Sequence, residues 1–144
     1  MYFAYGERET DYLRRKDPWL AQVIDAVGHI DREVDTDLFS AVVHHIVGQQ
    51  ISTKAQATVW RRLREALGTV DADSVLAAGE TGLQALGMTF RKAAYITDFA
   101  RRVRDGSFDP EAVRHMSDAD AVRALSRLKG IGVWTAEMIL LFCM

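Results

Sequence analysis

The sequence is poor in cysteine and proline, and it lacks an export signal. Its 144 residues include one cysteine, Cys143, and two prolines. A single cysteine excludes an intrachain disulfide framework and a cysteine-rich zinc or iron–sulfur site within these residues, and it suits a reducing compartment. The N-terminal residues also lack the cationic and then apolar pattern that directs secretion. We therefore expect a cytoplasmic protein.

The sequence has little net charge of either sign. Its formal charge is −2 and its isoelectric point is near 6.1, so it has no overall basic field. Any contact with nucleic acid must then rest on a local patch of positive charge. The 49% hydrophobic and 26% charged residues are typical of a globular domain with one core. We expect residues 1–144 to form a single domain.

Period-two alternation, proline-rich linkers and internal repeats are also absent. What the sequence has instead is a regular series of helix start and stop residues, such as Asp17 before Pro18, Asp109 before Pro110, and the capping residue Ser52. This series of start and stop residues predicts an all-α fold of about nine short helices. We expect them near residues 18–27, 37–48, 52–66, 73–78, 82–86, 89–104, 117–128 and 133–144, with one more starting at Pro110.

Two glycines, Gly130 and Gly132, flank one apolar residue between two expected helices. Glycine permits a positive φ and a close approach of another backbone. The amides of Gly130, Gly132 and Val133 would point outward at the start of the next helix, where free N–H groups and the helix dipole favour an anion. A nucleic-acid phosphate is the expected anion. The alternative is that these glycines only end one helix and start another.

Residues 133–144 are apolar apart from Thr135 and Glu137. This stretch is shorter than the roughly 20 residues of a membrane span, so we expect no membrane association. A helix that is apolar on all sides must be buried, which predicts a central helix with neighbours all round. The sequence ends there without a capping glycine or a polar exit. We expect a chain shortened at its C-terminus; the alternative is a natural end that docks into a groove or a partner chain.

Three segments in order resemble one family: IVGQQIS at residues 46–52, LGMTFRKAAYI at 86–96 and LKGIGVWTAEM at 128–138. They are similar to the helix-hairpin-helix (HhH-GPD) DNA glycosylase superfamily, and within it to the 3-methyladenine DNA glycosylase II group. The likeness extends over nearly the whole sequence. It implies a base-excision repair hydrolase that flips an alkylated base out of duplex DNA and cleaves its N-glycosidic bond. The implied partner is double-stranded DNA with a damaged base, and no obligate protein partner is evident.

The resemblance implies that Gly130 and Gly132 bind a DNA phosphate through their amides, with Thr135 close by. In relatives an alkali-metal ion, Na⁺ or K⁺, bridges the hairpin and the phosphate, and no other cofactor is required. The main-chain carbonyls expected to hold this ion are those of Ser126, Leu128 and Ile131. Lys129 stands where the family usually has proline. It either adds a cation near the phosphate or compensates the dipole of the preceding helix.

The family also assigns roles around the second and first segments. Gln50 falls where relatives fill the gap left by the flipped base, because its amide can donate to and accept from the orphaned partner base. Gln49 would support it; the alternative for both is plain helix capping. Among the cations of the second segment and the helix that follows, Lys92 is the one expected to face phosphate, although charged residues on a helix usually mark a solvated face.

Trp134 takes the position where strand-cleaving members of the superfamily carry a Schiff-base lysine. The resemblance therefore implies a glycosylase without lyase activity. Trp134 and Met138 lie one helical turn apart and would form the wall of the base pocket, since an aromatic face attracts a cationic alkylated base. The alternative is that both are simply part of the core.

The family places its catalytic aspartate beyond the hairpin, and after Gly132 the only acidic residue is Glu137, which sits too early. We therefore expect no catalytic residue within this sequence, and the expected Asp to lie beyond Met144. Two other hypotheses remain open. One is a DNA-binding module without catalysis, and the other is a truncated fragment that binds nothing.

Overall fold

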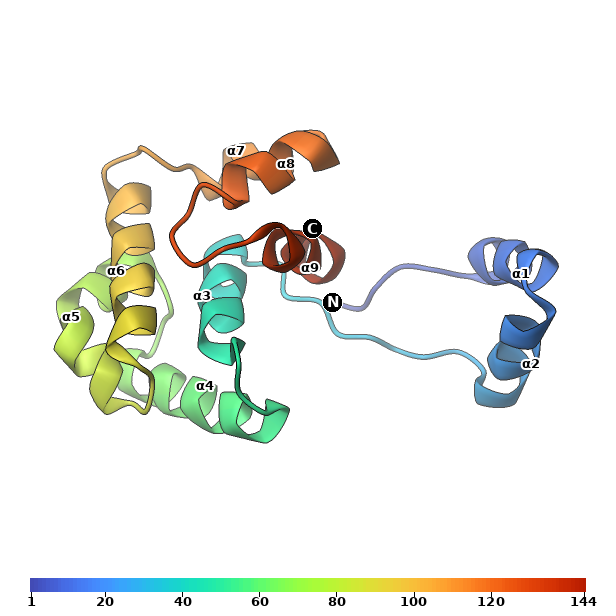
Figure 1. The fold of residues 1–144 in the computed structure, drawn as a ribbon, viewed down its shortest axis with the longest axis horizontal. Coiled ribbons are helices and arrows are strands. Elements are labelled where there is room, and N and C mark those ends of the chain that lie inside the picture. Colours follow the sequence, from blue (N-terminus) through green and yellow to red (C-terminus); the bar gives the residue numbers. More distant parts are fainter. The chain divides into compact units, whose positions relative to one another are not determined.

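The computed structural model describes residues 1–144, and the fold is all-α, as predicted. No strand is present, and no helix is long and apolar enough to cross a membrane. The nine helices are α1 (Glu7–Lys16), α2 (Pro18–Val27), α3 (Leu38–Gly48), α4 (Thr53–Leu67), α5 (Ala72–Ala85), α6 (Phe90–Arg104), α7 (Pro110–Arg114), α8 (Asp118–Leu125) and α9 (Val133–Cys143) (Figure 1). They fall into two compact units, Met1–Val34 and Asp35–Met144. The expectation of one domain over residues 1–144 stays a prediction.

The smaller unit, Met1–Val34, is a helical hairpin of α1 and α2 without a buried side chain in either helix. Asp17 ends α1 and starts α2, and its carboxylate accepts hydrogen bonds from the amides of Trp19 and Leu20. The ends of the unit meet where the Phe3 amide donates to the Arg32 carbonyl at 2.8 Å. Polar contacts rather than a core therefore hold this unit together.

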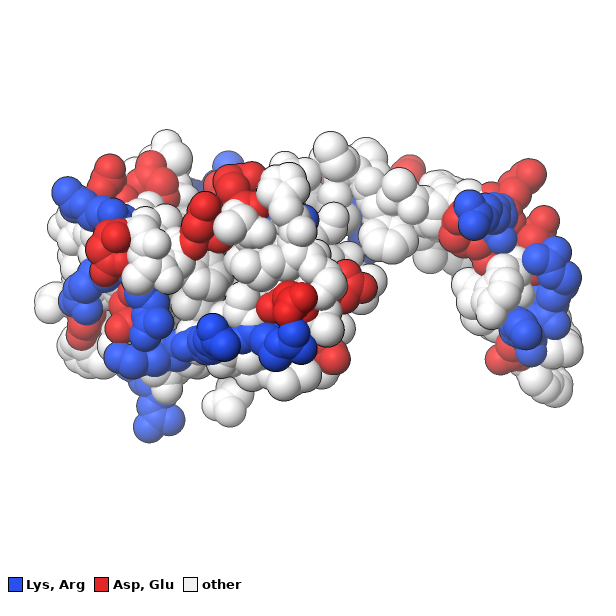
Figure 2. Space-filling model, turned by 90° about the horizontal axis from the view of Figure 1, so that it is seen from above, with Lys and Arg blue, Asp and Glu red and all other residues white.

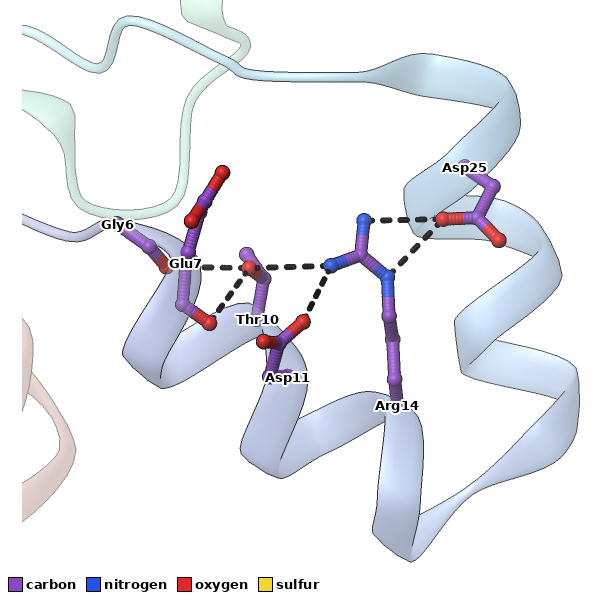
Figure 3. Close-up of polar contacts among 6 residues, drawn as sticks. All are labelled: Gly6, Glu7, Thr10, Asp11, Arg14 and Asp25. Carbon is purple, nitrogen blue, oxygen red and sulfur yellow. Dashed lines mark hydrogen bonds and ion pairs between the residues drawn. The ribbon is translucent and has the colours of Figure 1, made fainter.

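Arg14 makes the polar contacts that tie α1 to α2 (Figure 3). Its guanidinium donates to Asp25 of α2 at 3.0 Å and to Asp11 of its own helix at 2.9 Å. The hydroxyl of Thr10 also accepts from it at 3.4 Å. Because Asp11 and Asp25 are mostly exposed, water screens these ion pairs, and each contributes little to the free energy of unfolding.

The larger unit, Asp35–Met144, contains the hydrophobic core, and α3 lies at its centre. Helix α3 contacts α4, α6, α7 and α9, and α5 and α6 lie side by side along one flank (Figure 1). Most of the side chains of α3 are buried because apolar residues occupy nearly every position between Leu38 and Val47. The core continues through Phe99 of α6 and Ile139 of α9.

The helix starts lie close to the predicted ones. Each of α2 to α8 begins after a side chain that accepts a hydrogen bond from the first turn. Helix α1 was not expected. The two short helices expected within residues 73–86 correspond to the two parts of α5, which meet at a kink at Gly79, where φ is 65°. The acceptors are Asp17, Asp37, Ser52, Asp71, Thr89, Asp109 and Ser117.

The expectation that residues 133–144 form the central, fully surrounded helix is wrong. Helix α9 packs on α3 and α8, but one face is open: Val133 is 57% exposed, Trp134 70% and Leu141 47%. Its opposite face is buried and includes Cys143. Burial raises the pKa of the Cys143 thiol to about 11. The central position belongs to α3, whose contacts extend over four other helices.

Candidate nucleic-acid interface

The hairpin between α8 and α9 is shaped by Gly130. Its φ is +82°, a left-handed conformation that side-chain-bearing residues rarely adopt. A Cβ at this position would also lie 2.2 Å from Cδ2 of Tyr95 on α6. Gly130 is therefore required for two separate reasons, the backbone angle and the close approach of the tyrosine ring.

Gly132 starts α9 and leaves its first amides free. It is the N-cap of α9 and provides no side-chain cap, whereas α2 to α8 all have one. The amides of Gly130, Gly132 and Val133 donate to no group in the chain. Nothing lies within 4 Å of a Cβ built on Gly132, and its backbone is extended. The fold itself therefore does not require glycine at position 132.

The Gln49–Gln50 segment lies against this hairpin, as the side chain of Gln49 shows. Its Nε2 donates to the carbonyl of Gly130 at 2.6 Å, which joins residues 81 positions apart. Gln50 is exposed and has a φ of 57°; it is the one non-glycine residue of the chain with a positive φ. The structure thus brings together two of the three segments that the sequence singled out.

Lys92 connects the remaining segment, residues 86–96, to the end of α3 and does not form part of an exposed basic patch. Its ammonium donates to the carbonyls of Val47 at 2.8 Å and Gln49 at 2.7 Å. These carbonyls lie at the C-terminal end of α3, where helix carbonyls lack partners and the dipole favours a cation. Burial lowers the pKa of Lys92. The predicted phosphate contact of Lys92 stays untested, but its ammonium is already engaged.

Lys129 forms an ion pair that the sequence did not reveal. Its ammonium lies 3.0 Å from Oδ1 of Asp98 on α6, and Arg102 donates to the other carboxylate oxygen at 2.9 Å. Burial raises the pKa of Asp98, but the hydrogen bonds from Lys129 and Arg102 together lower it by more. The pKa of Asp98 therefore lies below its ordinary value. The hairpin is thus fastened to α6 by charge as well as by the packing of Gly130 on Tyr95.

Tyr95 and Asp98 belong to the site, although the sequence did not single them out. Tyr95 is half-buried and packs against the core as well as against Gly130. Both follow Lys92 at helical spacing on α6, so that one face of this helix touches the Gln49 carbonyl, Gly130 and Lys129. This i, i+3, i+6 spacing was visible in the sequence, but their partners come from distant segments.

Of the residues expected at the base pocket, Trp134 is 70% exposed directly after the hairpin and Met138 is half-buried one turn later. Thr135, expected near the phosphate, is 8% exposed and its side chain belongs to the buried face of α9. Trp134 therefore presents an open aromatic surface beside the free amides, whereas the Thr135 side chain is turned into the protein.

The carbonyls expected to hold an alkali-metal ion lie in one turn. The carbonyl of Leu128 accepts from the amide of Ile131 at 3.1 Å, while those of Ser126 and Ile131 accept no backbone amide. The hydroxyl oxygen of Ser126 is buried without a hydrogen-bond partner. Oxygen donors of this kind are the ligands that hard cations prefer, so the residues present fit such an ion.

Basic side chains form a row along one edge of the larger unit, with acidic side chains scattered over the rest of the same view (Figure 2). Residues 35–144 contain equal numbers of basic and acidic residues, so this unit has no net formal charge. Positive charge on this unit is thus gathered locally. A chain without an overall basic field can contact nucleic acid only through such a local patch.

Known proteins resemble this chain in both sequence and fold. DNA-3-methyladenine glycosylase of Bacillus subtilis (strain 168) is 30% identical over 124 residues, which cover 75% of this chain and 40% of that protein. The structure of a DNA-3-methyladenine glycosidase from Bacillus halodurans matches with a TM-score of 0.80 and 27% identity, over 99% of this chain and 67% of the other.

A third match supports the fold alone. The structure of a 3-methyladenine DNA glycosylase from Schizosaccharomyces pombe, in complex with abasic DNA, gives a TM-score of 0.83 at 22% identity, over 94% of this chain and 69% of the other. The chain spans about two fifths of the length of the curated relatives it matches. The family profile described as HhH-GPD superfamily base excision DNA repair protein matches residues 43–141, most of the larger unit. The chain therefore belongs to the HhH-GPD superfamily of base excision DNA repair proteins.

Proposed function

We propose that the full-length protein is a DNA glycosylase that removes alkylated bases, of the 3-methyladenine type, from duplex DNA by base flipping and hydrolysis of the N-glycosidic bond, and that residues 1–144 alone bind DNA without releasing a base. The observation that carries the proposal is the Gln49–Gly130 hydrogen bond, which sets the Gln49–Gln50 segment against the free amides of the hairpin. The similarity to 3-methyladenine DNA glycosylases supports the substrate class.

The hairpin and the Gln49–Gln50 segment perform the binding steps. The amides of Gly130, Gly132 and Val133 donate to a backbone phosphate, and the uncapped dipole of α9 adds to the attraction. Gln50 enters the gap left by the flipped nucleotide, because it is exposed and its amide group both donates and accepts. Gln49 holds the two elements together.

The exposed face of Trp134 stacks on the flipped base, with Met138 beside it. An alkylated purine is cationic, so an aromatic face binds it in preference to a neutral base. The absence of lysine at position 134 supports a glycosylase without lyase activity. The nearest lysine in the sequence, Lys129, is paired with Asp98.

We infer that Glu137 is not the catalytic carboxylate of the proposed enzyme, although it is the one acidic residue after the hairpin; it is exposed on α9. We expect E137Q to change neither base release by the full-length protein nor the affinity for abasic-site DNA. Loss of base release in E137Q would make Glu137 the catalytic residue.

An alkali-metal ion at the carbonyls of Ser126, Leu128 and Ile131 would supply positive charge between the hairpin and the phosphate. Its contribution is measurable without catalysis. DNA affinity in NaCl or KCl should exceed that in tetramethylammonium chloride at equal ionic strength, because the large cation cannot enter a turn. Equal affinity in all three salts would exclude the ion.

The function is tested by incubating the full-length protein with methylated duplex DNA and measuring released 3-methyladenine by chromatography. W134A should weaken binding and release by roughly tenfold or more, because stacking on an aromatic side chain contributes about 1–3 kcal/mol per base. L141A is the matched control, since Leu141 is also an exposed apolar residue of α9.

A second candidate function is a DNA-binding module without catalysis. It is favoured by the same hairpin geometry, which serves binding alone as well. Tight binding of the full-length protein to abasic-site DNA, with no base released from methylated DNA, would support the module. Absence of both binding and release would leave a fragment that does not act on DNA and would refute both functions.

A further inference from the structure

Gln50 is held in a strained backbone conformation at the tip of the proposed interface. Its φ of 57° lies in the left-handed region, which residues with a side chain rarely adopt and which strains the backbone. Such strain persists only where the surrounding structure enforces it. The residue before it, Gln49, has ordinary angles of φ −58° and ψ 130°. The constraint therefore acts on the peptide group that joins Gln49 to Gln50.

The carbonyl of that peptide group is the Gln49 oxygen, and Lys92 donates to it at 2.7 Å. Rotating the peptide group would bring the φ of Gln50 to negative values and relieve the strain. The same rotation would move the oxygen away from the ammonium. Lys92 is half-buried, so its ammonium would lose one of its two carbonyl partners where water replaces it poorly.

The side chain of Gln49 restrains the segment from the other direction. Its Nε2 donates to the Gly130 carbonyl at 2.6 Å, and Gly130 in turn rests on the ring of Tyr95. Lys92 and Tyr95 lie one turn apart on α6, on the same face. One face of α6 thus fixes both the peptide group that precedes Gln50 and the hairpin.

We propose that Lys92 is a positioning residue that latches the Gln49–Gln50 peptide group in the orientation that presents Gln50 to the DNA gap. Lys92 then acts through the carbonyl of Gln49 and contacts no phosphate. The use of this latch in gap filling rests on the proposed function, but the latch itself is a property of the free protein.

The first experiment measures the latch without DNA. A positive φ places the amide and α protons of Gln50 close together, which gives a strong intraresidue NOE in the NMR spectrum. We expect this NOE in the wild type and its loss in K92M, which keeps the apolar stem and removes the ammonium. R91M is the matched control, because Arg91 is the neighbouring cation and is exposed; it should retain the NOE.

The second experiment measures the consequence for DNA. The ratio of affinities for abasic-site and intact duplexes should fall roughly tenfold in K92M, which corresponds to about 1.4 kcal/mol. The salt dependence of binding should not change, because no phosphate contact is lost. A retained ratio with a salt slope lowered by about one would instead make Lys92 a phosphate contact and overturn the proposal.

A third variant separates the latch from general unfolding. Glycine accepts a positive φ without strain, so releasing the latch relieves strain in the wild type but not in Q50G. The melting temperature lost on adding K92M should therefore be larger in Q50G than in the wild type. Equal losses in the two backgrounds would contradict the latch. If the wild type shows the NOE and K92M loses it while neither binds DNA, the latch stands and the proposed function fails.

Discussion

The units Met1–Val34 and Asp35–Met144 use apolar residues in different ways. In the smaller unit Trp19 is 78% exposed and Val27 58%, and neither helix buries a side chain. In the larger unit Phe99 is 1% exposed and Ile139 fully buried. Large apolar side chains therefore stabilise the larger unit through burial, whereas those of the smaller unit remain in contact with solvent. Position in the fold, rather than hydrophobicity, decides what an apolar side chain contributes.

The two units also differ in charge and in the family match. The formal charge of −2 lies entirely in residues 1–34, since residues 35–144 are balanced. The match to the glycosylase superfamily falls within the larger unit. Stability and the candidate interface are thus concentrated in the same unit, and variants in it should have the larger effects.

The largest effect is expected from Phe99→Ala. Phe99 stacks on Phe39 with ring centroids 4.8 Å apart and meets Phe108 edge to face at 5.6 Å. Its removal should lower the free energy of unfolding by about 3–5 kcal/mol, measured by denaturant titration. Trp19→Ala in the smaller unit should change it by less than about 0.5 kcal/mol. Similar losses for the two variants would contradict the contrast between the units.

Gly130→Ala should have the next largest effect. The left-handed backbone alone costs a side-chain-bearing residue about 1–2 kcal/mol, and the new Cβ would clash with Tyr95. Gly132→Ala is the control within the same hairpin, because Gly132 is extended and has open space around it. Thermal melts of both variants distinguish the two glycines, and equal shifts would show that Gly130 has no special conformational demand.

A smaller effect should come from Asp98→Asn, up to about 1 kcal/mol at pH 7. The pKa of Asp98 is lowered in the folded chain, so its carboxylate stabilises the fold above the unfolded pKa of about 3.9. This stabilisation is lost as the pH falls through the lower, folded pKa. The difference in unfolding free energy between wild type and D98N should therefore be full at pH 7 and vanish at acidic pH.

Asp25→Asn is the matched variant in the smaller unit, where Asp25 pairs with Arg14 but is 66% exposed. Its effect at pH 7 should be smaller than that of D98N, because water screens an exposed pair more strongly. A larger effect for D25N would show that polar contacts stabilise the smaller unit more than its exposure indicates.

The smallest effect on stability, and the sharpest on function, is expected from Gly132→Ser. Serine is a slightly better N-cap than glycine, so the unfolding free energy should rise by a few tenths of a kcal/mol. The serine hydroxyl would accept from the amide of Trp134 or Thr135 and partly neutralise the exposed N-terminus of α9, where the proposed phosphate binds, so the affinity for DNA should fall. Unchanged affinity, measured by fluorescence anisotropy, would show that the N-terminus of α9 does not bind phosphate.

The sequence predicted local features well because they depend on neighbours in the chain. The capping residues Asp37 and Thr89 start α3 and α6 as expected, and Gly48 ends α3. The two-helix interpretation of residues 73–86 agrees with the break at Gly79.

Tertiary features were predicted less well, because they depend on contacts between distant segments. The apolar composition of α9 indicated a central helix, yet α3 takes that place and Trp134 is open. The pairing of Lys129 with Asp98, and of Lys92 with two carbonyls of α3, also requires three-dimensional contacts. The three motifs lie together in the fold, but the sequence did not show which groups the lysines contact.

The burial of Cys143 makes it a built-in reporter of local opening. A thiol whose pKa is about 11 and whose side chain is covered reacts slowly with labelling reagents at neutral pH. Because it is the one cysteine in the chain, its labelling rate measures how often the end of α9 separates from the core. Because Cys143 reacts slowly, a second cysteine introduced at an exposed position could be labelled selectively with a dye.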